Sequence, residues 1–170
     1  MLLQQGAGRL YLAPARSPEP NDLTSPWHTS WTYLGETKGG VEFVSNDSIG
    51  TQYVMESYAP IGMDRGDNVT TVAFSLASVT AKNLAVATAG VASGGGTNLS
   101  TFSPGALQTF WALGWESDEG TERWVYRKCF PTGDLSIVRS KSDSAVIPVL
   151  FTVFADYTGQ PLWTTITEDE

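Results

Sequence analysis

Two apolar stretches rich in β-branched and aromatic residues constrain this chain more than any other feature. The first, residues 68–77, alternates apolar with small polar side chains. Val72, Phe74 and Leu76 therefore share one face of a predicted strand. The second, residues 145–156, predicts another long strand near the end of the chain. Neither stretch carries a nucleophile, an acid–base pair or a set of metal ligands, so the pattern indicates sheet built for structure or assembly.

The composition predicts a single, mainly β domain spanning residues 1–170. A chain of 170 residues can bury one hydrophobic core, and 41% hydrophobic residues exclude a wholly disordered chain. Helix formers are sparse, whereas Thr, Ser, Val, Gly and aromatic residues are plentiful. The single cysteine, Cys129, excludes an intrachain disulfide, and we expect it to be a small, partly buried side chain.

The charge balance excludes a protein that grips nucleic acid through a basic surface. The chain carries 18 acidic against 10 basic residues, for a net charge of −8. Such a surface repels DNA, which is useful where DNA must slide past without sticking. Ordinary solubility explains the same charge more simply.

One short helix is expected at about residues 80–89, directly after the first apolar strand. Thr80 supplies a favourable N-cap, and Gly90 is a favoured residue for ending a helix. Leu84 gives the helix a modest apolar stripe. We therefore expect it to pack across an open sheet edge or the mouth of a barrel.

A long loop over residues 45–67 is expected to protrude as a hairpin with a flexible tip. Glycines and Pro60 interrupt its pattern, and loops of this size are usually functional. We expect it to be mobile in an isolated subunit. Its apolar side chains are candidates for contact with a neighbouring subunit, and they are Tyr53, Val54, Met55, Tyr58, Ile61 and Met63.

Further turns divide the rest of the chain. Gly39 and Gly40 predict a turn between two short strands, and residues 117–120 predict the turn of an aromatic hairpin. Pro148 predicts an edge position or a bulge in the last long strand. Residues 167–170 are expected to form a flexible acidic tail.

No catalytic, cofactor or metal site is predicted. His28 is the single histidine and is expected in a loop, and Asp118, Glu119 and Glu122 fall in or beside a hairpin turn, where acids are common. We expect no cofactor. No apolar run reaches the roughly 18–20 residues that a membrane-spanning helix needs, and the first residues lack a signal-peptide pattern.

The order of these elements resembles the major tail proteins, or tail-tube proteins, of long-tailed bacteriophages. Each matching motif is short, but together they cover most of the chain in the same order. The matching pieces are residues 8–14, residues 31–35 followed by 40–43, residues 69–76 leading into 80–85, and residues 147–156. The length and glycine content of residues 45–67 depart from that pattern.

The resemblance implies a β-sandwich or partly closed barrel with one flanking helix. It also implies self-assembly into stacked, hexameric rings that form a hollow tube through which genome DNA passes without tight binding. Expected partners are further copies of the chain, a tape measure protein and tail-end proteins. The expected location is the virion tail, assembled in the cytoplasm of the bacterial host.

Other functions remain open at this point. A tail terminator, a head–tail connector or a distal tail subunit would have a related fold. The six tryptophans also suit a β-sandwich carbohydrate-binding module. An enzyme is the least favoured class, because no catalytic set is found.

Overall fold

The computed structural model describes residues 2–5, 8–52, 62–93, 101–103, 109–134, 136–137, 145–155 and 161–168. Over these ranges the chain is mainly β, as the composition predicts, with a single short helix. The elements in chain order are β1 (Leu2–Gln5), β2 (Gly8–Pro14), β3 (Thr32–Gln52), β4 (Gly62–Leu76), α1 (Ala81–Ala87), β5 (Val91–Ser93), β6 (Thr101–Ser103), β7 (Trp111–Ser117), β8 (Glu122–Pro131), β9 (Ile147–Val153) and β10 (Trp163–Thr167).

Six of the strands close into a barrel. They follow the order β3–β2–β7–β8–β9–β4, and β4 pairs back onto β3 through antiparallel ladders throughout. Two short strands extend this barrel. β1 pairs with residues 41–44 of β3, which follow the part of β3 that pairs with β2. β10 pairs with residues 122–126 of β8, which precede the part of β8 that pairs with β9. Closure removes most exposed sheet edges from the body of the molecule.

The alternation seen in the sequence places the core inside the barrel. Val72, Phe74 and Leu76 of β4 are all buried, whereas Thr71 and Ser75 lie half-buried on the outer face. The same core contains fully buried rings and aliphatic side chains from five further strands, among them Leu10, Val41, Trp115, Tyr126 and Phe151. Each buried large apolar side chain stabilises the fold by about 1.5–3 kcal/mol.

The helix covers one end of this core, as expected for a helix at a barrel mouth. Val86 and Ala87 are buried in the core cluster, and Leu84 packs against it. The Thr80 side chain accepts a hydrogen bond from the Asn83 N–H at 3.2 Å, which confirms the predicted N-cap.

The helix ends earlier than predicted. It stops at Ala87 rather than reaching the glycine at position 90, and Ala89 adopts the left-handed conformation with φ of 49°. The Gly90 N–H then donates to the Ala85 carbonyl at 2.7 Å, a pattern that satisfies a carbonyl at the helix end. An alanine therefore takes the left-handed position that the sequence had assigned to glycine.

The Gly39–Gly40 pair is not a turn, contrary to the prediction. Strand β3 runs through it without interruption, and both glycines have positive φ, of 91° and 88°. The register between β3 and β4 shifts between Thr37 and Val41, so the glycines form a bulge. One long strand therefore replaces the two short strands that were expected.

Sheet pairing at the chain ends and after the helix was not predicted. β1 and β10 are short, and β5 pairs with β6 to form a separate two-stranded sheet. Thr167 belongs to β10 and not to a flexible tail. Pro148 of β9 pairs with Ser75 of β4 on one side. On the other side, β9 pairs with β8 only from Phe151 onward, so Pro148 lies at an edge there, as predicted.

Candidate assembly surfaces

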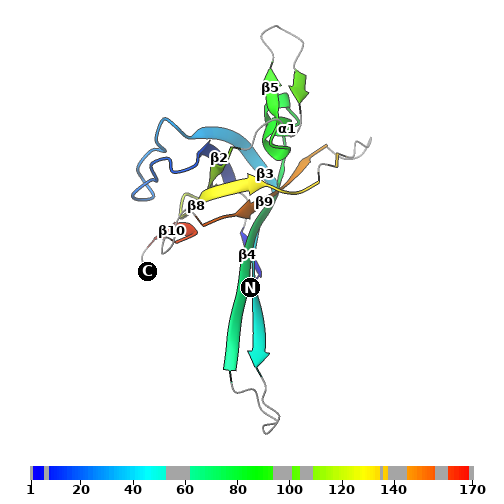
Figure 1. Ribbon diagram of the computed structural model, residues 1–170. Helices are drawn as coiled ribbons and strands as arrows, with labels where there is room; N and C mark the ends of the chain where they lie inside the picture. The colour runs from blue at the N-terminus through cyan, green and yellow to red at the C-terminus, as the bar shows by residue number, and fades with distance from the viewer. Residues whose placement is uncertain are drawn as a thin grey trace.

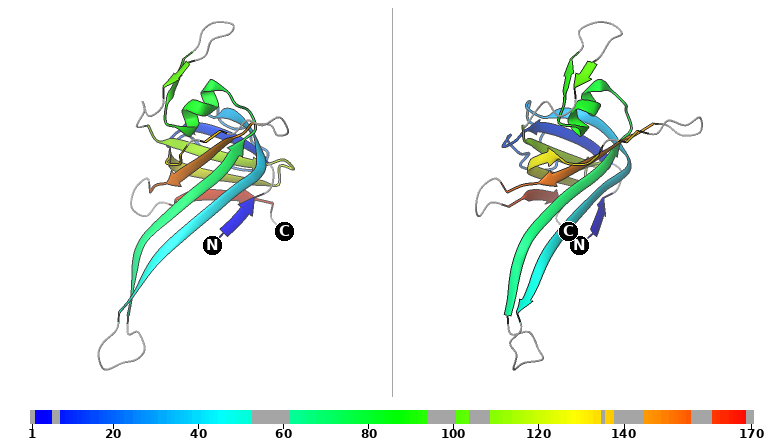
Figure 2. Two further views of the ribbon diagram at one scale, coloured as in Figure 1. Left: turned by 90° about the vertical axis from the view of Figure 1, so that its right-hand side faces the viewer. Right: turned by 45° about the vertical axis from the view of Figure 1, so that its right-hand side comes forward.

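The β3–β4 hairpin leaves the barrel and extends well beyond it (Figures 1 and 2). Its two strands stay paired from Asn46↔Val69 out to Gln52↔Gly62, with one shift of register between Asp47 and Ile49. The ladder from β9 stops at Thr70, and that from β1 stops at Val44. Within the described parts of the chain, no third strand therefore pairs along either edge of the outer half of the hairpin. Such edges carry a row of N–H and C=O groups ready to pair with another chain.

One of the six predicted contact residues lies in the described part of this hairpin. Met63 is in β4, where it pairs with Thr51 of β3. Nearer the barrel, the Val69 side chain is 48% exposed. The other five candidates lie outside the described residues, namely Tyr53, Val54, Met55, Tyr58 and Ile61.

An apolar groove lies at the end of the barrel opposite the hairpin. It is a hollow of about 510 Å³ between α1 and the ends of β2, β3 and β7. In Figure 2 the helix and the hairpin lie on opposite sides of the barrel. Lys82 stands at the rim of the groove, and its walls include Leu12, Leu34, Ala85, Val86 and Trp111.

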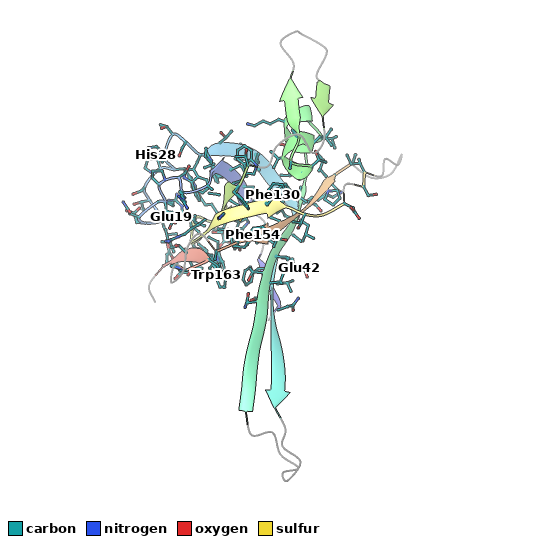
Figure 3. All side chains as sticks on the ribbon, in the orientation of Figure 1. Glu19, His28, Glu42, Phe130, Phe154 and Trp163 are labelled. Atoms are coloured by element: carbon teal, nitrogen blue, oxygen red, sulfur yellow. The ribbon has the colours of Figure 1, made fainter. Side chains whose placement is uncertain are left out.

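A second apolar surface is an aromatic patch formed by Phe110, Phe130 and Phe154. These rings come from the residue before β7, the end of β8 and the residue after β9, and two of them are labelled in Figure 3. The Phe110 ring meets the other two edge-on at 5.9 and 5.4 Å between centroids. Phe110 and Phe154 are more than a third exposed, and the Lys128 ammonium lies 4.6 Å from the Phe110 centroid.

The segment between β2 and β3, residues 15–31, is by contrast held tightly on the outside of the barrel. Its principal anchor is Arg123 of β8, which is only 5% exposed. The guanidinium donates to the carbonyls of Asp22 and Ser25, both at 2.7 Å, and pairs with the Glu116 carboxylate at 3.1 Å. We call residues 15–31 the anchored arm.

Aromatic packing reinforces the anchored arm. Trp27 stacks on Tyr11 at 4.6 Å between centroids and donates from its indole N–H to Glu116 at 2.6 Å. Trp31 donates to the Pro18 carbonyl at 2.8 Å. Both indoles lie over Gly114, where an added Cβ would meet the Trp27 ring at 2.5 Å. The glycine therefore makes room for the arm.

Two kinds of local environment shift pKa values in the described residues: hydrogen bonds in a turn of the arm, and burial in the core. Hydrogen bonds from the Ser25 backbone and hydroxyl, and then from Thr24, lower the pKa of Asp22 to about 2. Burial raises the pKa of the Cys129 thiol to about 12, and it raises the pKa of Tyr126 as well. Cys129 is fully buried, not partly as predicted, and a thiol in that environment is a poor nucleophile.

The described residues contain no cluster of three or more side chains suited to holding a metal ion. His28 lies exposed in the anchored arm, as predicted, with Nδ1 2.9 Å from the Ser30 hydroxyl. Asp118 and Glu119 are exposed in the turn between β7 and β8, and Glu122 bonds the Trp124 indole N–H. Among the described residues, no helix combines the length and hydropathy needed to cross a membrane.

The sequence did not reveal the groove, the aromatic patch or the role of Arg123. Each depends on residues distant in the chain: Arg123 contacts backbone about 100 positions earlier, and the three phenylalanines come from three strand ends. The alternation of apolar residues along the strands predicts only which side chains face the core inside the barrel. Phe130 and Phe154 follow buried residues and hence lie on the outer face.

Comparison with known proteins agrees with this architecture. No curated protein matches the chain. A family model described as phage tail tube protein matches residues 2–170. That match covers nearly the whole chain, including the barrel, the helix and the hairpin. The chain belongs to the phage tail tube protein family, and is therefore a structural component of the virion, part of a multimeric phage tail.

Proposed function

We propose that this protein self-assembles into hexameric rings that stack into the tail tube, the conduit for genome DNA. The observation that carries the proposal is the long β3–β4 hairpin, which projects from a closed barrel and whose described outer half pairs with no third strand. The inner parts of β3 and β4 close the barrel, so the outer half of the hairpin is not needed to complete it. Its purpose is best explained by contact with another copy.

A tube needs two different kinds of contact. Neighbours within a ring meet through a heterologous contact that closes by rotation, and successive rings meet through an axial contact. Exposed aromatic surface, such as Phe110 and Phe154, supports the first kind, because aromatic residues are enriched at interfaces. The projecting hairpin supports the second.

We assign the axial contact to the hairpin and its tip. The candidate residues there are Tyr53, Val54, Met55, Tyr58, Ile61 and Met63. Burying each large apolar side chain contributes about 1.5–3 kcal/mol, while ordering each backbone residue costs about 1–2 kcal/mol. Side-chain burial alone does not offset that cost, so backbone hydrogen bonds to the neighbour must contribute. Stacking should therefore be cooperative and depend on concentration.

The negative charge suits a conduit. With a net charge of −8 the protein offers DNA little release of counterions, so we expect no measurable affinity for duplex DNA at physiological salt. The further partners would be a tape measure protein and tail-end proteins, with assembly in the cytoplasm of the bacterial host. A tail terminator, connector or distal tail subunit is the alternative, and it would stop at single rings.

Sedimentation velocity and negative-stain microscopy of the purified protein test the proposal together. We expect rings at low concentration and tubes of uniform diameter as concentration rises. Single rings at every concentration would favour the terminator or connector class. Monomers alone, over a range of protein and salt concentrations, would contradict the proposal.

A further inference from the structure

The groove beside α1 has the properties expected of a receiving site for the hairpin. We propose that it binds the outer end of the β3–β4 hairpin from a copy in the adjacent ring. This inference rests on the proposed stacking of rings and names the surface on which that stacking depends. The occupant is thus a second copy of this chain.

The hairpin and the groove lie at opposite ends of the barrel (Figure 2). In a head-to-tail contact, one copy presents a surface at one end and its neighbour presents a different surface at the other end. The hairpin projects from one side of the barrel, and the helix lies on the opposite side (Figures 1 and 2). Copies stacked along the hairpin direction therefore bring the hairpin of one toward the helix of the next.

The apolar lining of the groove matches apolar side chains of the segment between β3 and β4. The groove is walled mainly by apolar side chains, including Leu12, Leu34 and Val86, and its volume of about 510 Å³ is enough to admit several side chains. The segment joining β3 to β4 carries Tyr, Val, Met and Ile residues that a partner surface could bury. The same chain therefore carries both an apolar groove and apolar side chains that could fill it.

The hairpin and the groove carry charges of opposite sign. Residues 45–67 carry four carboxylates, from Asp47, Glu56, Asp64 and Asp67, against one arginine, which gives a formal charge of −3. The charged residue that lines the groove is Lys82, and its side chain is exposed at the rim. A rim cation facing an acidic hairpin fixes the orientation of docking and speeds encounter.

The aromatic patch is the competing receiver. Phe110 and Phe154 are exposed there, and Lys128 supplies a cation as well. Its rings, however, already contact one another edge-on across three strand ends, and the hollow of about 370 Å³ beside Phe110 and Lys128 is smaller than the groove beside α1. Figure 3 places Phe130 and Phe154 over the barrel body and not at the end opposite the hairpin. We therefore assign that patch no role in receiving the hairpin.

Cysteine cross-linking within assembled tubes distinguishes the two receivers. Gln52→Cys, at the outermost described pair of the hairpin, is combined with Lys82→Cys at the groove. The matched control combines Gln52→Cys with Lys128→Cys at the aromatic patch. Cys129 is fully buried and serves as an unreactive background. After treatment with a short bismaleimide, the first pair should give a ladder of covalent oligomers, whereas each single variant and the control pair should not.

The charge at the rim gives a second readout. Lys82→Glu keeps the fold, because the residue is exposed and an acid is favourable in the first turn of a helix. It should raise the concentration needed for tubes roughly tenfold, whereas Lys38→Glu, at an exposed position of β3 outside the groove, should change that concentration little.

Three outcomes are informative. A ladder from the groove pair alone supports the inference. Tubes visible by microscopy with a ladder from the control pair, and none from the groove pair, overturn the inference while leaving the proposed function intact. Failure of the wild-type chain to form any tube overturns both.

Discussion

The anchored arm and the outer half of the hairpin both leave the barrel, yet they are held in opposite ways. The arm, residues 15–31, contains no strand or helix, but its backbone carbonyls, indoles and carboxylates contact the barrel. The hairpin is regular β-structure through Gln52 and Gly62, but its outer half pairs only with itself among the described residues. Regular secondary structure and attachment to the core are therefore separate properties in this protein.

This contrast bears on function. An isolated two-stranded hairpin is marginally stable in water, whereas a segment with many buried contacts is fixed in place. The arm thus contributes to the stability of the isolated subunit. The outer hairpin adds little to the subunit and is suited to gain its contacts from a neighbour. Substitutions in the arm should accordingly lower the free energy of unfolding of the subunit, whereas substitutions in the outer hairpin should weaken tube formation.

The largest effect on subunit stability is expected from Arg123→Met. The substitution leaves the Glu116 carboxylate, whose side chain is 12% exposed, without its cation, and it frees two carbonyls of the arm. Breaking a buried pair in this way costs about 3–5 kcal/mol. Chemical denaturation measures the loss, and Arg9→Met, at an exposed position of β2, is the control. An unchanged midpoint for Arg123→Met would mean that the arm is not anchored through this residue.

Gly114→Ala should have the next largest effect. The new methyl group would lie 2.5 Å from the Trp27 ring, so the indole must move away from the barrel. Overpacking of this kind costs about 1–3 kcal/mol. In a Trp27→Leu background the added methyl should cost less, because the opposing ring is gone. Equal costs in both backgrounds, measured by thermal or chemical unfolding, would contradict the packing described here.

Acidification should loosen one turn of the arm. The folded-state pKa of Asp22 is about 2, below the ordinary value of 3.8, so its hydrogen bonds stabilise the turn above pH 4. That contribution should be lost progressively as the pH falls from about 4 to about 2. An NMR titration should show the Thr24 and Ser25 amide protons following this low pKa. Asp22→Asn removes the titration and serves as the control. A midpoint near 4 would disprove the capping role.

The smallest effect on stability is expected in the hairpin. Val69 is 48% exposed, and replacing it with serine should change the free energy of unfolding by less than about 0.5 kcal/mol. If the hairpin is an assembly element, however, the same variant should still weaken tube formation. A clear loss of subunit stability would show that the outer hairpin is part of the folding unit, and the contrast with the arm would fail.

The sequence predicted those parts of the molecule that depend on local pattern. Alternation in β4 correctly placed Val72, Phe74 and Leu76 in the core, and the Thr80 cap correctly began the helix. The Gly39–Gly40 pair was misread because the same dipeptide suits a turn or a bulge, and the long-range register with β4 decides between them.

Other features had no local signal. β1 and β10 are short strands whose pairing is set by β3 and β8, far away in the chain. The resemblance to tail-tube proteins predicted a mainly β fold and a structural tail protein. The structure confirms the mainly β fold, and the family model confirms the structural tail protein. The receiving groove could not be predicted, because α1, β2, β3 and β7 come together only in the folded barrel.

The central claim is that the outer end of the hairpin joins rings while the barrel folds without that end. Its most direct test is negative-stain microscopy of a variant lacking residues 52–63, closed by a short turn, beside the wild type at equal concentration. Circular dichroism and cooperative unfolding establish that the variant is folded. We predict a folded subunit that forms rings at most and no tubes, whereas the wild type forms tubes. Tubes of normal length from the shortened variant would contradict the account.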